Sequence, residues 1–406
     1  MNKVAVAAMA VTLLVGATSA NASDPFAQAR VDWNRPQAPF HVIGNVYYVG
    51  PAGVSAYLIV TPQGDILTDG GLPESADQIE ANIKALGFDI KDVKILLNSH
   101  AHFDHAGGLA QLKRDSGAQL LASGADKPYL ENGRIDFGPS IADPFPPVSV
   151  DRVIRDGETI SLGGVSLTAM ITPGHTPGCT NWTMKLSEGG VSHKVIFFCS
   201  ITTGGNPLVD NRAYPSIAAD YEASFARLKA TARDIDVFLA PHGDQMDLQA
   251  KLHRLERDNK VNPFVDKAGF GLLLAAMEKQ FDDELARQNA ARLNAPPDGQ
   301  TIINARDATP PEKQTKGVLE NLFTSTLVVD SVPAASYSTD KTGLFTVVLA
   351  TGEVWSQQAD DNARVRWKGE ASQLIITVRK GFLGSYNLEV GGDSNRYNVR
   401  PLRPLW

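Results

Sequence analysis

The chain has 406 residues, of which 43% are hydrophobic and 20% charged, a composition typical of a soluble protein with room for two domains. Its formal net charge of −7 argues against nucleic acid as a partner, because phosphate binding requires a basic surface. Beyond the N-terminal segment, no apolar run approaches the length of a membrane-spanning helix. The composition therefore disfavours nucleic-acid-binding and integral membrane proteins.

The first 22 residues have the pattern of a secretory signal peptide. Met1-Asn2-Lys3 is a short basic start, residues 4–17 are apolar and small, and Ala20-Asn21-Ala22 is an A-x-A cleavage site. The apolar stretch is too short for a spanning helix, and no Cys near the cleavage point could carry a lipid. We therefore expect a mature chain that begins at Ser23, has no membrane anchor and resides in the periplasm.

From Phe40 to about residue 240, strand-like and helix-like segments alternate. Apolar runs bounded by Gly, Pro and polar residues predict strands, and Ile79, Ile83 and Leu86 share one face of a predicted helix. The expected strands are 41–43, 46–49, 56–60, 65–69, 92–97, 119–122, 165–171, 181–186, 194–198 and 237–240, and the expected helices are 75–86, one that starts with residues 109–113, and 218–232. This order predicts an α/β fold of stacked sheets flanked by helices.

The C-terminal part has a different pattern. Residues 248–288 predict helix with a break at Asn262-Pro263, and 291–316 predict a Pro-rich linker after a main domain of residues 23–290. Short β-type runs predominate from 317 to 406, so we expect a small all-β C-terminal domain there. That domain contains no His and no Cys, and we assign it no catalytic role.

The chain has two cysteines, Cys179 and Cys199. If the strands 181–186 and 194–198 form a hairpin, the two sulfurs lie on facing strands. An oxidising compartment would permit a disulfide between them. We nevertheless expect two separate buried thiols.

A cluster of four side chains that can bind a metal follows the predicted strand 92–97. His100, His102, Asp104 and His105 lie within six residues, at a strand-to-helix loop. In an extended segment His100 and His102 point to the same side and can share one metal. Asp104 and His105, displaced along the turn, can face a second position beside it.

Two further histidines occupy similar strand-end loops. His175 follows strand 165–171 and His242 follows strand 237–240, and both are flanked by Pro and Gly. Six converging ligands suit two metal sites with three ligands each, which leaves positions for water and is typical of catalytic metals. Imidazole and carboxylate donors suit zinc, with iron or manganese as alternatives. The expected chemistry is hydrolysis without a covalent enzyme intermediate.

These motifs resemble those of the metallo-β-lactamase superfamily. The stretches 33–36, 44–50, 211–215 and 262–266 are similar to subclass B3, and the resemblance covers about residues 32–288. It implies an αββα four-layer sandwich, with the C-terminal β domain outside it. Most superfamily hydrolases carry a metal-bridging Asp where this chain has Ser200, and the absence of that Asp matches subclass B3.

The resemblance also implies roles for individual residues. His100, His102 and His175 would hold one zinc, while Asp104, His105 and His242 would hold the second. A hydroxide bridging the two ions would attack the β-lactam carbonyl, and Asp104 would orient it and relay its proton as the catalytic carboxylate. The residues expected to contact substrate are Ser200, Thr202 and Asn206, together with Phe137 and Ile141, for which ordinary loop packing is the equal alternative.

We therefore predict a secreted di-zinc β-lactamase of subclass B3 type that acts on small-molecule β-lactams and confers resistance to them. The sequence does not determine its oligomeric state, for which a monomer is the favoured expectation. Another hydrolase on the same site, a lactonase or thioesterase, is the first alternative, which the missing bridging Asp disfavours. An envelope binding protein with a structural metal is the second alternative. The intact set of six ligands with open positions disfavours it.

Overall fold

The computed structural model describes residues 26–257 and 261–293 and, with short gaps, residues 326–401. The predicted signal peptide lies outside the described residues. Of the predicted linker 291–316, residues 291–293 are helical and the rest lie outside the described residues. No helix among the described residues has the length and apolar character needed to cross a membrane.

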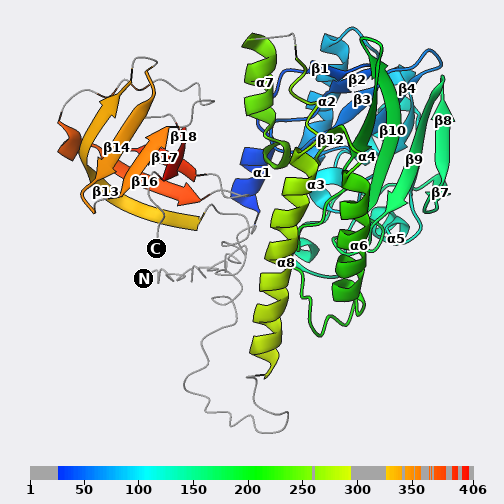
Figure 1. Ribbon diagram of the computed structural model, residues 1–406. Coiled ribbons are helices and arrows are strands. Elements are labelled where there is room, and N and C mark those ends of the chain that lie inside the picture. Colours follow the sequence, from blue (N-terminus) through cyan, green and yellow to red (C-terminus); the bar gives the residue numbers. More distant parts are fainter. Residues whose placement is uncertain are drawn as a thin grey trace, which may run out of the picture.

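The first described unit contains two sheets (Figure 1). The first sheet has the strand order β1-β2-β3-β4-β5-β6-β7 and the second the order β12-β11-β10-β9-β8. The strands are β1 (Phe40–Ile43), β2 (Val46–Tyr48), β3 (Tyr57–Ile59), β4 (Asp65–Thr68), β5 (Val93–Leu97), β6 (Gln119–Ser123), β7 (Arg152–Ile154), β8 (Thr159–Leu162), β9 (Val165–Ile171), β10 (Thr180–Glu188), β11 (Val191–Phe197) and β12 (Val237–Leu239).

Helices cover the outer faces of both sheets. The α-helices are α1 (Ala27–Trp33), α2 (Ala76–Ala85), α3 (Phe103–Ala106), α4 (Leu109–Ser116), α5 (Lys127–Asn132), α6 (Ile217–Ala232), α7 (Leu248–Arg257) and α8 (Gly269–Leu293). Short 3-10 helices occur at η1 (Pro73–Ser75), η2 (Ile90–Asp92), η3 (Pro139–Ala142) and η4 (Gly243–Met246). The sequence had not predicted α1, α3, α5, β7 or β8.

Helix periodicity explains which faces are buried. In α2, Ile79 and Ile83 are fully buried and pack with residues of α4 against the first sheet. In α6, Tyr221 and Phe225 contact the ring of Phe281 in α8, and Figure 1 shows these two helices side by side. A second core joins the facing sheets with α6 and α8. The result is the predicted αββα four-layer sandwich.

Strand direction determines where the functional loops lie. Strands β4, β5, β6 and β7 are parallel neighbours, and β12 is parallel to β11. The carboxyl ends of parallel strands meet at the same edge of a sheet, so the loops after β4, β5 and β6 lie together there. An isolated β-bridge pairs Val54, between β2 and β3 of the first sheet, with His242, which follows β12 of the second sheet. This bridge joins the two sheets at the same edge.

The C-terminal unit is a closed barrel with the strand order β13-β14-β15-β18-β17-β16, drawn in orange and red in Figure 1. Its elements are β13 (Thr326–Thr339), β14 (Phe345–Leu349), β15 (Val354–Gln357), η5 (Ala371–Gln373), β16 (Ile375–Lys380), β17 (Tyr386–Val390) and β18 (Arg396–Pro401). Val347, Trp355, Ile376 and Tyr397 are fully buried in its core. This is the extra β module that the sequence predicted.

Cys179 and Cys199 form a disulfide with a Cα–Cα distance of 5.8 Å, so the prediction of two separate thiols is wrong. The hairpin of β10 and β11 pairs Trp182 with Phe197. Continuing that register past the open end of the hairpin places residues 179 and 199 almost opposite each other. The sequence identified the hairpin, but the closeness of the two chains beyond it depends on tertiary packing.

Candidate metal centre

Three histidine nitrogens from two loops face one another at the shared edge. His100 and His102 follow β5, and His175 follows β9. His175 Nε2 lies 3.1 Å from His100 Nε2 and 3.0 Å from His102 Nδ1. A tetrahedral zinc about 2 Å from each nitrogen would separate the nitrogens by about 3.3 Å, so the three donors fit such an ion.

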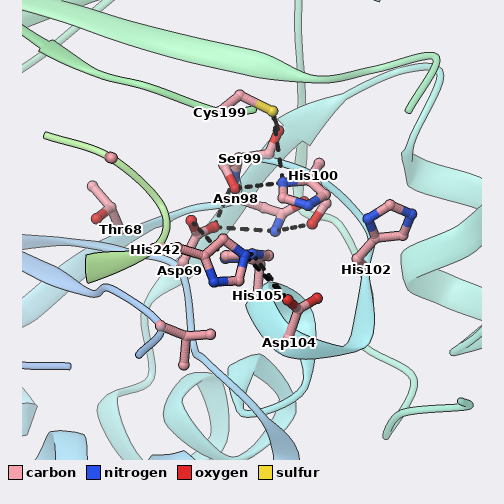
Figure 2. Close-up of polar contacts among 12 residues, drawn as sticks. Thr68, Asp69, Asn98, Ser99, His100, His102, Asp104, His105, Cys199 and His242 are labelled. Carbon is pink, nitrogen blue, oxygen red and sulfur yellow. Dashed lines mark hydrogen bonds and ion pairs between the residues drawn. The ribbon is translucent and has the colours of Figure 1, made fainter. Parts of the chain in front are cut away.

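A second set of three donors lies beside the first. His242, after β12, brings its Nε2 to 3.3 Å from His105 Nε2. Asp104 Oδ2 lies 3.3 Å from His105 Nε2 and 3.5 Å from His242 Nε2. The ring centroids of His100 and His105 are 4.4 Å apart, so the two sets are neighbours. Figure 2 shows the ligands of residues 100–105 on one turn of chain, with His242 beside them. The structure therefore brings together all six residues predicted as ligands.

The second nitrogen of most rings is held by a neighbouring group. His100 Nδ1 lies 2.9 Å from Ser99 Oγ, and His175 Nδ1 lies 2.7 Å from the carbonyl oxygen of Thr202. His242 Nδ1 lies 3.2 Å from the carbonyl oxygen of Gly53. Such contacts fix ring orientation and leave the other nitrogen for a metal.

Burial keeps most of these rings neutral. It lowers the pKa of His175 and of His242 to about 4, and it lowers the pKa of His100 and of His102 well below the usual value of imidazole. At pH 7 these four side chains therefore carry a free lone pair, which is the form that binds a metal.

Asp104 and His105 shift each other's titration in opposite directions. Burial alone would raise the pKa of Asp104, but the neighbouring His105 and His242 outweigh burial and hold that pKa below its usual range. Burial would lower the pKa of His105, and the Asp104 carboxylate outweighs it, so the pKa of His105 is raised. Asp104 is therefore an ionised carboxylate at neutral pH, buried to 6% exposure.

Asp69 is a site residue that the sequence analysis did not identify. It directly follows β4 and has a positive φ of 57°, uncommon outside glycine. Its Oδ1 accepts a 2.7 Å hydrogen bond from the Ser99 backbone N–H and one of 3.3 Å from the Asn98 amide, and Oδ2 lies 3.9 Å from His105 Nδ1 (Figure 2). A carboxylate at the end of a buried strand, before Gly70-Gly71, was the available signal.

The N-terminal helix α1 borders the centre, which was also unexpected. The Trp33 ring lies 5.2 Å from the His242 ring and 6.2 Å from the Phe103 ring. The Arg30 guanidinium lies 4.6 Å from the centroid of the Phe103 ring and bonds to Asp143 at 2.9 Å. Helix α1 therefore packs beside the ligand turn.

The residues predicted to contact substrate occupy different positions. Ser200 is buried, and its Oγ lies 3.5 Å from Oγ1 of the half-buried Thr202. The Asn206 amide is buried and donates at 3.3 Å to the carbonyl oxygen of His175, so it supports the ligand loop. The substrate role of these three stays a prediction.

Phe137 and Ile141, the predicted cleft residues, differ from each other. Phe137 is 3% exposed and its ring contacts Tyr129 and Tyr214. Of the two expectations for this residue, ordinary loop packing therefore describes it, and contact with substrate does not. The physical reason is that an aromatic ring at this point of the loop reaches the core between the sheets. Ile141, in η3, is 43% exposed and remains available for contact with a ligand.

Comparison with known proteins agrees with this geometry. The family model described as the metallo-beta-lactamase superfamily matches residues 49–187. The structure is similar to BJP-1, a subclass B3 metallo-beta-lactamase of Bradyrhizobium japonicum, with 43% identity and a TM-score of 0.60 over 64% of this chain and 98% of that chain.

Curated relatives are more distant. A probable metallo-hydrolase of Burkholderia pseudomallei is 36% identical over 122 residues, which span 29% of this chain and 39% of that protein. An N-acyl homoserine lactonase of a Bacillus species is 27% identical over 164 residues, spanning 34% of this chain and 60% of that protein. The chain therefore belongs to the metallo-β-lactamase superfamily of metal-binding hydrolases, and subclass B3 metallo-β-lactamases are its structural neighbours.

Proposed function

We propose that this protein is a β-lactamase that hydrolyses the amide bond of β-lactam antibiotics with two zinc ions. The observation that carries the proposal is the division of six donor atoms into two neighbouring sets of three, with spacings of 3.0–3.5 Å within the sets. Three protein donors per ion leave a coordination position for water or substrate. The similarity to subclass B3 enzymes supports β-lactams as the substrate class.

Zinc ions held by these sets would supply a Lewis acid for the substrate carbonyl and a water of lowered pKa. The chain's own contribution begins with Asp104. Its ionised carboxylate, between His105 and His242, accepts a hydrogen bond from the attacking water and so orients it toward the carbonyl carbon. The same carboxylate is placed to receive the proton and pass it to the amide nitrogen as the ring opens.

Hydroxyl groups beside His175 bind the other end of the substrate. β-Lactams carry a carboxylate, and the hydroxyls of Ser200 and Thr202 are hydrogen-bond donors next to the three-histidine set. Donors placed in a partly buried site hold a carboxylate more strongly than in water, because the local dielectric is lower. Thr202, as the more exposed of the two, makes the first contact.

A lactonase or thioesterase is the second candidate function, favoured by the curated lactonase relative. Superfamily hydrolases of that kind carry a bridging Asp where this chain has the buried Ser200. A serine hydroxyl does not replace a carboxylate as a metal bridge, because it is not ionised at neutral pH. We therefore place β-lactams first. We further propose that the protein acts in the periplasm and confers β-lactam resistance there.

The test uses the mature chain from Ser23, assayed against a penicillin, a cephalosporin, a carbapenem, an acyl-homoserine lactone and an acyl thioester. We expect turnover of at least one β-lactam, loss of that turnover on treatment with a chelator, and its return on addition of zinc. Metal analysis is expected to give two zinc ions per chain. Zinc-loaded protein that opens the lactone and leaves all three β-lactams intact would overturn the proposal.

A further inference from the structure

One buried carboxylate, that of Asp126, connects the two loops that carry the three-histidine set. Asp126 is 1% exposed and lies between β6 and α5. Its Oδ2 accepts a 3.0 Å hydrogen bond from the Ala101 backbone N–H and a 2.7 Å bond from Thr176 Oγ1. Its Oδ1 accepts a 2.8 Å bond from the Gly178 backbone N–H. Each of these donors belongs to one of the two loops.

The donors lie next to the ligands themselves. Ala101 separates His100 from His102, and Thr176 directly follows His175. A carboxylate that holds Ala101 N–H on one side and Thr176 Oγ1 on the other sets the distance between the backbones of both loops. That distance decides whether three imidazole nitrogens meet at about 3 Å, as metal binding requires.

Asp126 is itself firmly placed. Its backbone N–H donates to Ser123 Oγ at 3.1 Å, and its carbonyl oxygen accepts from the N–H groups of Tyr129 and Leu130 at 3.0 and 3.1 Å. The approach to Gly178 is so close that a Cβ added there would lie 2.7 Å from Asp126 Cγ and 1.9 Å from Ser123 Oγ. Any residue other than glycine at position 178 would therefore push the loop away from the carboxylate.

The second donor set has different supports. His105 faces Asp69, and His242 is held by the carbonyl oxygen of Gly53. No contact described in this structure links Asp126 to Asp104, His105 or His242. Residues 100–105 carry ligands of both sets, and Asp69 also bonds to the backbone N–H of Ser99, but the described contacts of Asp126 reach only the loops of the three-histidine set.

We propose that Asp126 is the positioning residue of the three-histidine metal site, and that its loss weakens this site selectively. The inference rests on the metal binding put forward above. Removing a group that orients metal ligands costs about 10- to 100-fold in metal affinity. We expect a loss of that size at one of the two sites and an unchanged affinity at the other.

The experiment measures stepwise Zn²⁺ binding by competition with a chromophoric chelator, using the full mature chain. Asp126→Asn keeps one acceptor oxygen and Asp126→Ala keeps none, so the loss of affinity is expected to be larger for alanine. Thr176→Val removes one donor and keeps the shape of the side chain, which tests the same link if the Asp126 variants fold poorly. Asp65→Asn is the matched control, since Asp65 is a buried carboxylate with a backbone donor, Thr61 N–H, at the opposite end of β4.

A second readout needs no metal. In the metal-free protein, amide hydrogen exchange at Ala101 and Gly178 is expected to be faster in Asp126→Asn than in wild type and unchanged in Asp65→Asn. The inference would be overturned if folded Asp126→Asn and Thr176→Val both bound zinc at each site as tightly as wild type does. An equal loss of affinity at both sites would also overturn it. If wild type itself binds no zinc, the proposed function fails, which is a distinct result.

Discussion

The Nε2 atoms of His105 and His242 lie 3.3 Å apart although 137 residues separate them in the chain. His105 stands in the turn after β5 of the first sheet, and His242 follows β12 of the second sheet. The contact therefore spans the two sheets of the sandwich. Correct packing of one sheet on the other is a condition for the second metal position.

Replacing His242 by alanine removes one of three donors from the second set. We expect zinc content to fall from two ions to one per chain and kcat/KM to fall by at least about 100-fold. Metal analysis and steady-state kinetics of His242→Ala measure both effects. His253→Ala is the control, because His253 lies on α7 with 42% of its side chain exposed, and it is expected to behave as wild type. Two zinc ions retained in His242→Ala would contradict the ligand assignment.

The metal-free protein is expected to lose stability on acidification because of its buried histidines. Unfolded histidine titrates near pH 6.5, whereas burial lowers the pKa of His175 and of His242 to about 4 in the folded state. Between these values the unfolded chain binds more protons, so the free energy of unfolding falls as pH falls. The raised pKa of His105 acts in the opposite direction and offsets part of the effect.

Urea unfolding of chelator-treated protein at pH 7 and pH 4.5 tests this sign. Wild type should lose more unfolding free energy between the two pH values than a His175→Ala/His242→Ala double variant. The two proteins share every carboxylate, and the only neighbouring carboxylate among the described residues whose titration the His242 change also alters is Asp104, which stays ionised at both pH values while His105 holds its pKa below the usual range. An equal pH dependence in the two proteins would show that these rings do not resist protonation.

The disulfide lies directly behind the three-histidine set. Cys199 Sγ is 3.6 Å from His100 Nδ1 and 3.3 Å from the carbonyl oxygen of Ser99 (Figure 2). The bond to Cys179 closes a loop with a sequence separation of 20, for which chain entropy predicts a stabilisation of about 3 kcal/mol. We expect Cys179→Ala/Cys199→Ala to lose about that much stability and to bind zinc more weakly.

Urea unfolding and zinc competition measure these two quantities. Reductant should move wild type toward the double variant and leave the double variant itself unchanged. If oxidised and reduced wild type had the same free energy of unfolding, the disulfide would not stabilise the fold, and the prediction would be contradicted.

The C-terminal barrel is expected to be dispensable for hydrolysis. The match with BJP-1 covers 98% of that protein but 64% of this chain, so that enzyme has no counterpart of much of the remaining sequence. A chain ending at Leu293, after α8, should therefore keep two zinc ions and a kcat/KM within about twofold of the full chain. Steady-state kinetics of the two proteins decide this. A large loss of turnover in a truncated protein that still binds two zinc ions would assign the barrel a role at the site.

Much of the site was predictable because its signals are local. Three histidines and an aspartate within six residues, directly after an apolar run, indicate metal ligands whatever the rest of the fold does. The same holds for His175 and His242, each at the end of a strand and flanked by Pro and Gly. Periodicity likewise predicted α2 and α6 and most strands of both sheets.

What the sequence could not reveal depends on contacts between segments far apart. The disulfide, the roles of Asp69 and Asp126 and the packing of Phe137 all follow from which loops meet, and a single buried carboxylate has no distinguishing pattern along the chain. The sequence by itself determined which side chains can bind metal and at which strand ends they stand. Only the tertiary structure decided their partners, because the distance between loops is set by the packing of one sheet on the other.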